Sequence, residues 1–145
     1  DRCDRHYTNQ KWLRRDFGNK LPSEVFREHS LACYVTDKTA LKLRHEIGID
    51  NIAWECDYPH SDCFWPDAPE KVHAELTAAG ADDADIDKIT WQNSCRFFSW
   101  DPFAHTPREQ ATVGALRAQA TDVDTAIRSR AEWRRRYEEK QRRLA

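Results

Sequence analysis

A carboxylate and an imidazole lie close together in the sequence where a short apolar run ends. Residues 51–66 read NIAWECDYPHSDCFWP, in which Ile52 to Trp54 are apolar, Asp57 follows the run and His60 comes three residues later. A carboxylate at the end of a strand can coordinate a divalent metal ion, or accept a proton from water bound to that ion. An aspartate there also often caps a helix or organises a loop, so both roles stay open.

Two strands and the helices that follow them are expected to position Asp57. Residues 31–36 and 49–56 are apolar, partly β-branched runs typical of strands covered on both faces. Helices are expected over 39–47, with Thr39 as the cap, and over 70–79, each ending at a glycine. This alternation is typical of parallel βαβ units, in which ligands bind beyond the carboxyl ends of the strands.

The rest of the chain is predicted to be mainly helical. Helices are expected over 1–17 and 85–98, and the second should point Phe97 and Phe98 inward, together with Ile86, Ile89 and Cys95. A long, mostly solvated helix should begin at Thr121 and run through the charged C-terminal residues.

Charge divides the chain near His105. Residues 105–145 hold ten Lys or Arg and six Asp or Glu, which gives +4, whereas residues 1–104 carry −6. We therefore predict two parts, the βα units of 1–104 and a charged helical extension of 105–145. Acidic residues are interleaved with the basic ones and no recognition motif is present, so we expect the extension to pack against protein rather than nucleic acid.

The cysteines and the hydropathy pattern indicate in which cellular compartment the protein is expected. The five cysteines are an odd number without a Cys-x-x-Cys pair, which argues against a disulfide scaffold or a zinc knuckle. We expect buried free thiols in a reducing, cytoplasmic environment. No run approaches the ~20 apolar residues that a membrane-spanning helix needs, so no membrane partner is expected.

The block WECDYPHSDCFWPDAPE, followed after a helix by KITWQNSCRFFSW, resembles the C-terminal end of amidohydrolase family 2. The resemblance covers about residues 20–100 and includes the upstream LPSEVFREH and EIGIDN. The family comprises TIM-barrel metal-dependent hydrolases, and decarboxylases related to aminocarboxymuconate-semialdehyde decarboxylase. The resemblance implies an α/β fold, namely the C-terminal part of a (β/α)8 barrel, here with a helical C-terminal extension.

The resemblance also implies roles for individual residues. Asp57 matches the family aspartate that closes the last barrel strand, ligates the active-site metal and often transfers the proton; we expect a divalent ion, with zinc as the first choice. His60 belongs to the same motif, and its role varies among relatives, so we assign it to substrate contact. Trp65 lies in the loop that should overhang the pocket and is also expected to contact substrate. Asn93 and Arg96 match the terminal family helix, where a structural role is expected.

The histidine pattern departs from the family. Members take further metal ligands from a His-x-His pair and a middle-strand histidine, but none of the six histidines here forms a His-x-His. The missing ligands would lie upstream, since a barrel needs about 250 residues, and these residues alone are expected to be inactive. We predict hydrolysis of a small organic substrate; the alternatives are decarboxylation, or a non-catalytic segment that completes another chain. The expected protein partner is a second copy, forming a homo-oligomer, or the missing N-terminal barrel portion.

Overall fold

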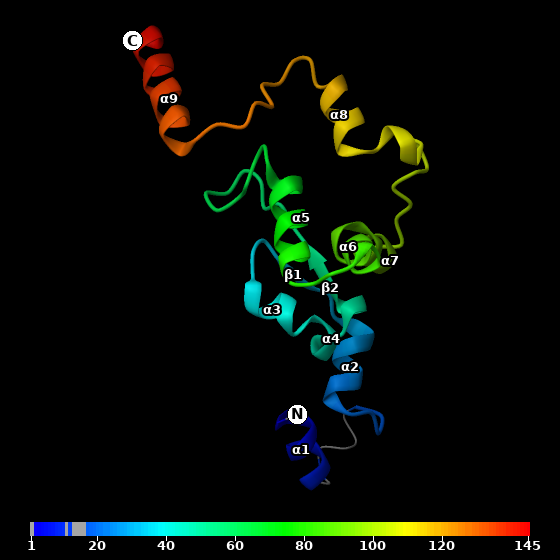
Figure 1. Ribbon diagram of the computed structural model, residues 1–145. Helices are drawn as coiled ribbons and strands as arrows, with labels where there is room; N and C mark the ends of the chain where they lie inside the picture. Colours follow the sequence, from blue (N-terminus) through cyan, green and yellow to red (C-terminus); the bar gives the residue numbers. More distant parts are fainter. Residues whose placement is uncertain (1, 11, 13–16) are drawn as a thin grey trace.

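A parallel strand pair forms the centre of the molecule. The computed structural model describes residues 2–10, 12 and 17–145, and it shows a mixed α/β fold that is mostly helical. Strand β1 (Ala32–Tyr34) pairs in parallel with β2 (Ile52–Trp54), with Ala32 opposite Ile52 (Figure 1). The predicted strand–helix–strand–helix order is confirmed. Both strands are shorter than predicted, and a 3₁₀ helix over Ile49–Asn51 takes the first residues of the second run.

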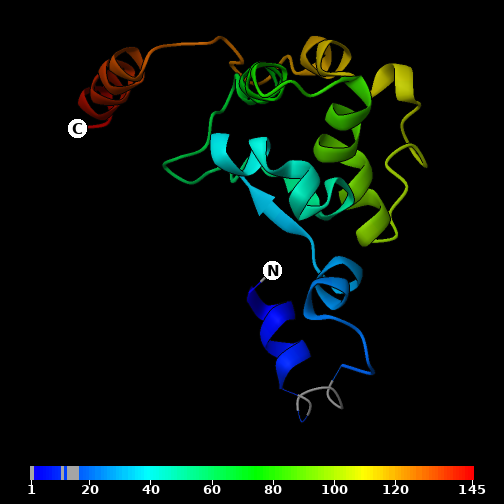
Figure 2. The same ribbon diagram turned by 60° about the horizontal axis from the view of Figure 1, so that its bottom comes forward.

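Helices flank the strand pair and extend the chain at both ends (Figures 1 and 2). The helix predicted over 1–17 is confirmed only as far as Asn9, where α1 ends. Gln10 is not helical and Phe17 lies in a turn, and positions 1, 11 and 13–16 lie outside the described residues. No described helix has both the length and the apolar character needed to cross a membrane. The described α-helices are α1 (Arg2–Asn9), α2 (Pro22–His29), α3 (Lys38–Lys42), α4 (Arg44–Ile47), α5 (Ala68–Ala78), α6 (Asp83–Asp87), α7 (Asn93–Phe97), α8 (Val113–Gln119) and α9 (Arg130–Leu144).

Asp37, rather than Thr39, begins the helical segment after β1. Its carboxylate accepts hydrogen bonds from the amide nitrogens of Thr39 and Ala40, both at 2.9 Å, and so caps α3. The single helix predicted over 39–47 is divided into α3 and α4. Helix α4 ends at Gly48, whose φ of +113° is a backbone conformation that residues other than glycine rarely adopt.

The core lies between the strands and the helices on one side of them. Leu41 of α3, Leu76 of α5 and Ile89 are fully buried and form one cluster with Tyr34 and Ile52, one from each strand. The prediction that both strands are covered on both faces is wrong for β1, since its Ala32 and Cys33 are exposed. Successive side chains of a strand point to opposite faces, so within the described part of the chain neither face of β1 is fully covered at these positions.

A π-helical turn alters the predicted helix over 85–98. The turn, Lys88–Gln92, joins α6 to α7. Because such a turn inserts one residue into the helix, it rotates the residues that follow it relative to the face that an unbroken helix would bury. Phe97 and Phe98 are accordingly 49% and 71% exposed, and their predicted inward orientation is wrong. Asn93 is buried instead, and its side-chain nitrogen donates to the carbonyls of Ile49 and Ile52, both at 2.8 Å.

The predicted state of the cysteines is only partly confirmed. All five are free. None is buried, however, since Cys3 and Cys33 are exposed, and Cys56, Cys63 and Cys95 are half-buried. The exposure of Cys33 has the same cause as that of Ala32, because both lie on the uncovered strand β1.

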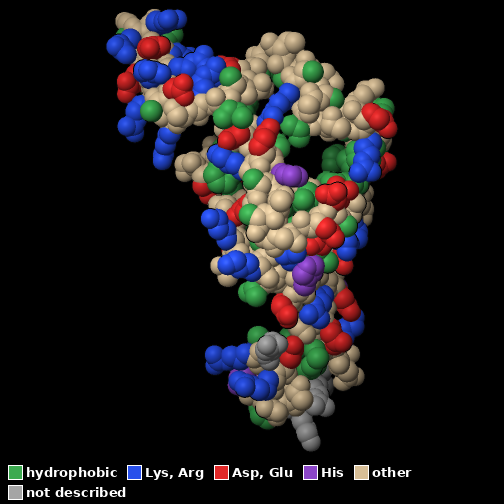
Figure 3. All heavy atoms as spheres, viewed as in Figure 1, with side chains coloured by type: hydrophobic (Ala, Val, Ile, Leu, Met, Phe, Trp, Pro, Cys, Tyr) green, Lys and Arg blue, Asp and Glu red, His purple; other side chains and the backbone are tan. Residues whose placement is uncertain are grey.

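The C-terminal extension contains two helices where one was predicted. Ser129, not Thr121, begins α9: its hydroxyl accepts from the amide of Glu132, while the Glu132 carboxylate accepts from the amide of Ser129. No residue of α9 is buried, and both ribbon views show this helix standing apart from the strand pair (Figures 1 and 2). Its basic side chains gather at the upper left of Figure 3.

One arginine of α8 binds the first turn of α5. The Arg117 guanidinium forms a bidentate ion pair with the Glu70 carboxylate. Its Nη2 also donates a hydrogen bond of 2.8 Å to the carbonyl of Pro66. The Arg117 guanidinium lowers the pKa of Glu70 below its ordinary value. The extension is therefore linked to the loop that follows β2.

We expect acid to weaken the docking of α8. Because the folded pKa of Glu70 is lowered, its contribution to docking is complete above the unfolded value, about 4.3, and is lost as the pH falls through the folded pKa. The methyl resonances of Leu116, which shares a cavity with Trp65, should move toward random-coil shifts below about pH 4. Glu70→Gln should produce this shift at neutral pH, and unchanged resonances in that variant would contradict the assignment.

Candidate metal centre

Asp57 lies at the carboxyl end of β2, where the sequence places it. The chain turns there, since Asp57 has a φ of +54°, a left-handed conformation that aspartate tolerates better than most residues. Its carbonyl accepts from the amide of His60 at 2.8 Å, which folds the loop back on itself. The loop then continues to the start of α5.

Asp57 and Asp37 both follow strands, but their carboxylates make different contacts. Asp37 is the cap of α3, so its oxygens are engaged with backbone amides. Within the described part of the chain, no backbone amide donates to the Asp57 carboxylate; it contacts His60 instead, with Oδ2 2.8 Å from Nδ1. The side chain of Asp57 is about one-third exposed, at 34%. The helix cap is therefore Asp37 and not Asp57. The Asp57 side chain does bond within its own loop, to His60, as a loop organiser would.

Three potential metal ligands meet at this loop. One ligand atom from each of Asp57, His60 and Asp62 lies within 4.8 Å of the other two. Two carboxylates and an imidazole are a donor set that suits zinc and other divalent first-row ions. Ligands of a tetrahedral zinc ion lie about 3.4 Å apart. To bind such an ion, ligand atoms that lie up to 4.8 Å apart would have to approach one another. Asp57 Oδ2 and His60 Nδ1, which are 2.8 Å apart, would have to exchange their hydrogen bond for contacts with the ion. The residues present therefore fit such an ion in type and approximate spacing.

The structure adds Asp62 to the site and gives His60 a contact that the sequence does not predict. Asp62 reads as a turn former in sequence, yet it belongs to the cluster. The spacing Asp-x-x-His-x-Asp within one loop is the signal that could have identified it. His60 was assigned to substrate contact; in the structure it is 70% exposed and contacts the carboxylate that it would help to orient.

Trp65 lies farther along the same loop. Its ring packs against Tyr58, with the ring centroids 6.3 Å apart and the planes inclined by 51°. Trp65 also lines an apolar cavity of about 280 Å³ together with Cys56 and with Leu116 of α8. The structure thus places Trp65 beside the extension and gives it a packing role in addition to the predicted contact with substrate.

Comparison with known proteins does not extend the assignment. No protein-family model matches the chain, and no curated protein matches it. The resemblance to amidohydrolase family 2 therefore rests on the sequence motifs, and the functional argument rests on the geometry of the loop after β2.

Proposed function

We propose that this chain supplies Asp57 to the divalent metal centre of a metal-dependent hydrolase that acts on a small organic substrate. The observation that carries the proposal is the position of Asp57: at the carboxyl end of a parallel strand, free of a capping role and beside His60 and Asp62. Ligands of parallel α/β folds bind at this end of the strands. The motif resemblance described above supports the same role.

The chemistry follows from the side chains present. A bound divalent ion lowers the pKa of a water ligand toward about 7. Asp57 would be one of the residues that hold the ion, and its carboxylate would be the group placed to take up and release a proton there. His60, whose Nδ1 lies 2.8 Å from Asp57 Oδ2, would orient that carboxylate. Trp65 and the imidazole of His60 then offer contacts to substrate.

In this proposal β1 and β2 are two strands of a (β/α)8 barrel. The remaining strands and histidine ligands come from polypeptide outside residues 1–145, because a barrel of this kind requires about 250 residues. A decarboxylase of the same family would use the same aspartate to manage the proton at the carbon that loses carbon dioxide. The two reactions differ in substrate rather than in the role proposed for Asp57.

A second candidate function accounts for one specific observation, which the hydrolase proposal also accommodates. Ala32 and Cys33 of β1 are exposed, as expected of a strand that another polypeptide covers. A segment of this kind could complete the barrel of another chain without holding a metal. In this alternative the cluster of Asp57, His60 and Asp62 only organises the loop.

Native mass spectrometry with metal analysis separates the two candidates. The protein should be isolated from its own cells under mild conditions and without chelators. The hydrolase proposal predicts a divalent ion, held together with the rest of the barrel, and no hydrolysis by residues 1–145 alone. A folded, metal-free monomer would overturn it, whereas a metal-free complex with a second polypeptide would support the completing segment.

A further inference from the structure

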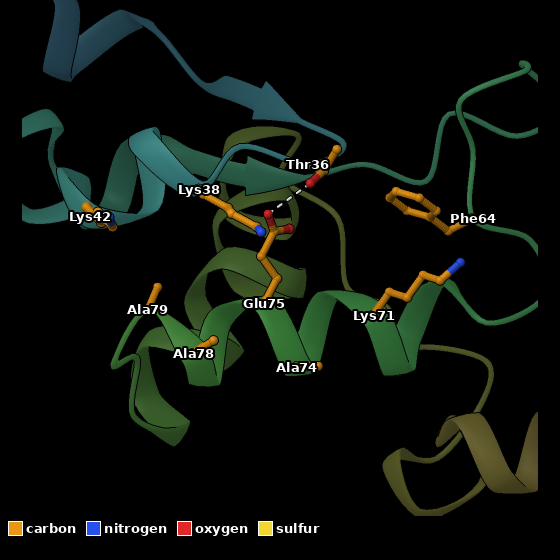
Figure 4. Close-up of a pocket in the computed structure, with 9 residues that line it drawn as sticks. All are labelled: Thr36, Lys38, Lys42, Phe64, Lys71, Ala74, Glu75, Ala78 and Ala79. Carbon is orange, nitrogen blue, oxygen red and sulfur yellow. Dashed lines mark hydrogen bonds between the residues drawn. The ribbon is translucent and has the colours of Figure 1, made fainter.

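A second pocket, separate from the candidate metal centre, lies between α3 and α5 and has a volume of about 470 Å³ (Figure 4). Its floor is one face of α5, where Ala74 and Ala78 are four residues apart and therefore lie on the same side of the helix. Their small side chains leave room between the two helices. Phe64, from the loop after β2, closes one end of this space with its ring. The pocket therefore has a largely apolar surface.

Three ammonium groups stand around this apolar floor. Lys38 and Lys42 come from successive turns of α3, and Lys71 comes from the first half of α5. Lys71 is already engaged, with its Nζ 3.0 Å from an Asp67 oxygen and 4.5 Å from the centre of the Phe64 ring. Among the described residues, no carboxylate oxygen lies within 4.0 Å of the ammonium of Lys38 or Lys42. Lys38 and Lys42 thus form no ion pair with another described residue, although the Lys38 side chain points toward Glu75 in Figure 4.

One carboxylate also lines the pocket, and it is held in place. Glu75 Oε1 accepts a hydrogen bond of 2.8 Å from the hydroxyl of Thr36, which follows β1 (Figure 4). The lining thus combines three ammonium groups with a single anchored carboxylate, and its net charge is positive. An inorganic anion bound to the lysines would not contact the apolar floor of the pocket. A neutral hydrocarbon bound on that floor would leave the lysine charges without a partner.

We propose that this pocket binds a small aromatic carboxylate. The carboxylate of the ligand accepts charge-assisted hydrogen bonds from Lys38 and Lys42, and its ring lies on the alanine face of α5 against Phe64. The volume falls within the ~300–1,000 Å³ range of small-molecule sites. The site contains neither Asp57 nor a metal, so its occupancy is independent of the proposed hydrolase function.

Calorimetric titration of the purified chain with 2-naphthoate, in EDTA and at low ionic strength, tests the proposal. One equivalent should bind, and the double variant Lys38→Gln, Lys42→Gln should weaken binding at least about tenfold. Lys140→Gln, an exposed lysine on α9, is the matched control and should leave affinity unchanged. 2-Naphthol, which keeps the ring and lacks the charge, should bind at least about tenfold more weakly than 2-naphthoate.

A further variant examines the apolar floor. Ala78 is exposed on α5, so Ala78→Leu should leave the thermal unfolding temperature near that of the parent while it fills the pocket and abolishes 2-naphthoate binding. Failure of the parent chain to bind 2-naphthoate would overturn the proposal. So would equal affinity in the double lysine variant and the control, or an inorganic phosphate affinity as high as that for 2-naphthoate.

Discussion

Asp57→Asn is expected to weaken zinc binding by the chain at least about 100-fold. Changing a residue that only hydrogen-bonds to a metal ligand typically lowers metal affinity by about 10–100-fold. Asparagine keeps the size of the side chain and tolerates the φ of +54° at this position, so the loop should retain its shape. The variant removes the negative charge that a divalent ion requires and that also faces His60. Competition with a chromophoric chelator at neutral pH measures the affinity.

A matched aspartate outside the loop provides the control. Asp122 is exposed, and Asp122→Asn should bind zinc as the parent chain does. His60→Ala and Asp62→Asn should each weaken binding, because both residues belong to the cluster. If Asp57→Asn and Asp122→Asn bound zinc equally well, Asp57 would not be a ligand and the proposed hydrolase would lose its central residue.

Arg44→Ala is expected to be strongly destabilising, by about 3–5 kcal/mol. Arg44 is 8% exposed, and its Nε donates to the Asp85 carboxylate at 2.8 Å. Its terminal nitrogens donate to the carbonyls of Leu41, Ala79 and Gly80 at 2.9–3.1 Å. Truncation would leave a half-buried carboxylate and three carbonyls without this donor, and would separate α4 from the end of α5. Urea unfolding followed by circular dichroism measures the change in free energy.

Two further arginine variants sharpen this test. Arg135 is exposed on α9, and Arg135→Ala should change the free energy of unfolding by less than about 0.5 kcal/mol. Arg44→Met keeps much of the side-chain volume but cannot donate, so it should remain destabilising. A loss below about 1 kcal/mol in Arg44→Ala would show that these carbonyls find other partners at little cost.

Much of the arrangement around β1 and β2 could be predicted from the sequence. The two apolar runs locate the strands, and Gly48 and Gly80 mark helix ends because both adopt positive φ. The position of Asp57 after β2 follows from the same pattern. These features are local, which is why a single sequence reveals them; the division of the chain at residue 104 stays a prediction.

Features that depend on tertiary contacts could not be predicted in this way. Periodicity does not reveal the π-helical turn at Lys88–Gln92, which turns Phe97 and Phe98 toward solvent. The Ser129 cap is different, because its reciprocal bond with Glu132 is local and its spacing is visible in the sequence; it could have been predicted in place of Thr121. The spacing of Asp62 from Asp57 and His60 is visible in the sequence, but that the three side chains come together depends on how the loop folds back at Asp57.

Among the described residues no strand pairs with the outer edge of β1, and we expect this edge to influence association of the protein at high concentration. Unpaired amide and carbonyl groups on an uncovered strand can bond to any extended backbone, including the same strand of a second molecule related by a two-fold axis. Such self-pairing would occupy the edge that a barrel-completing polypeptide needs. A low protein concentration should therefore favour assembly with a different polypeptide, and a high concentration should favour dimers of two identical chains.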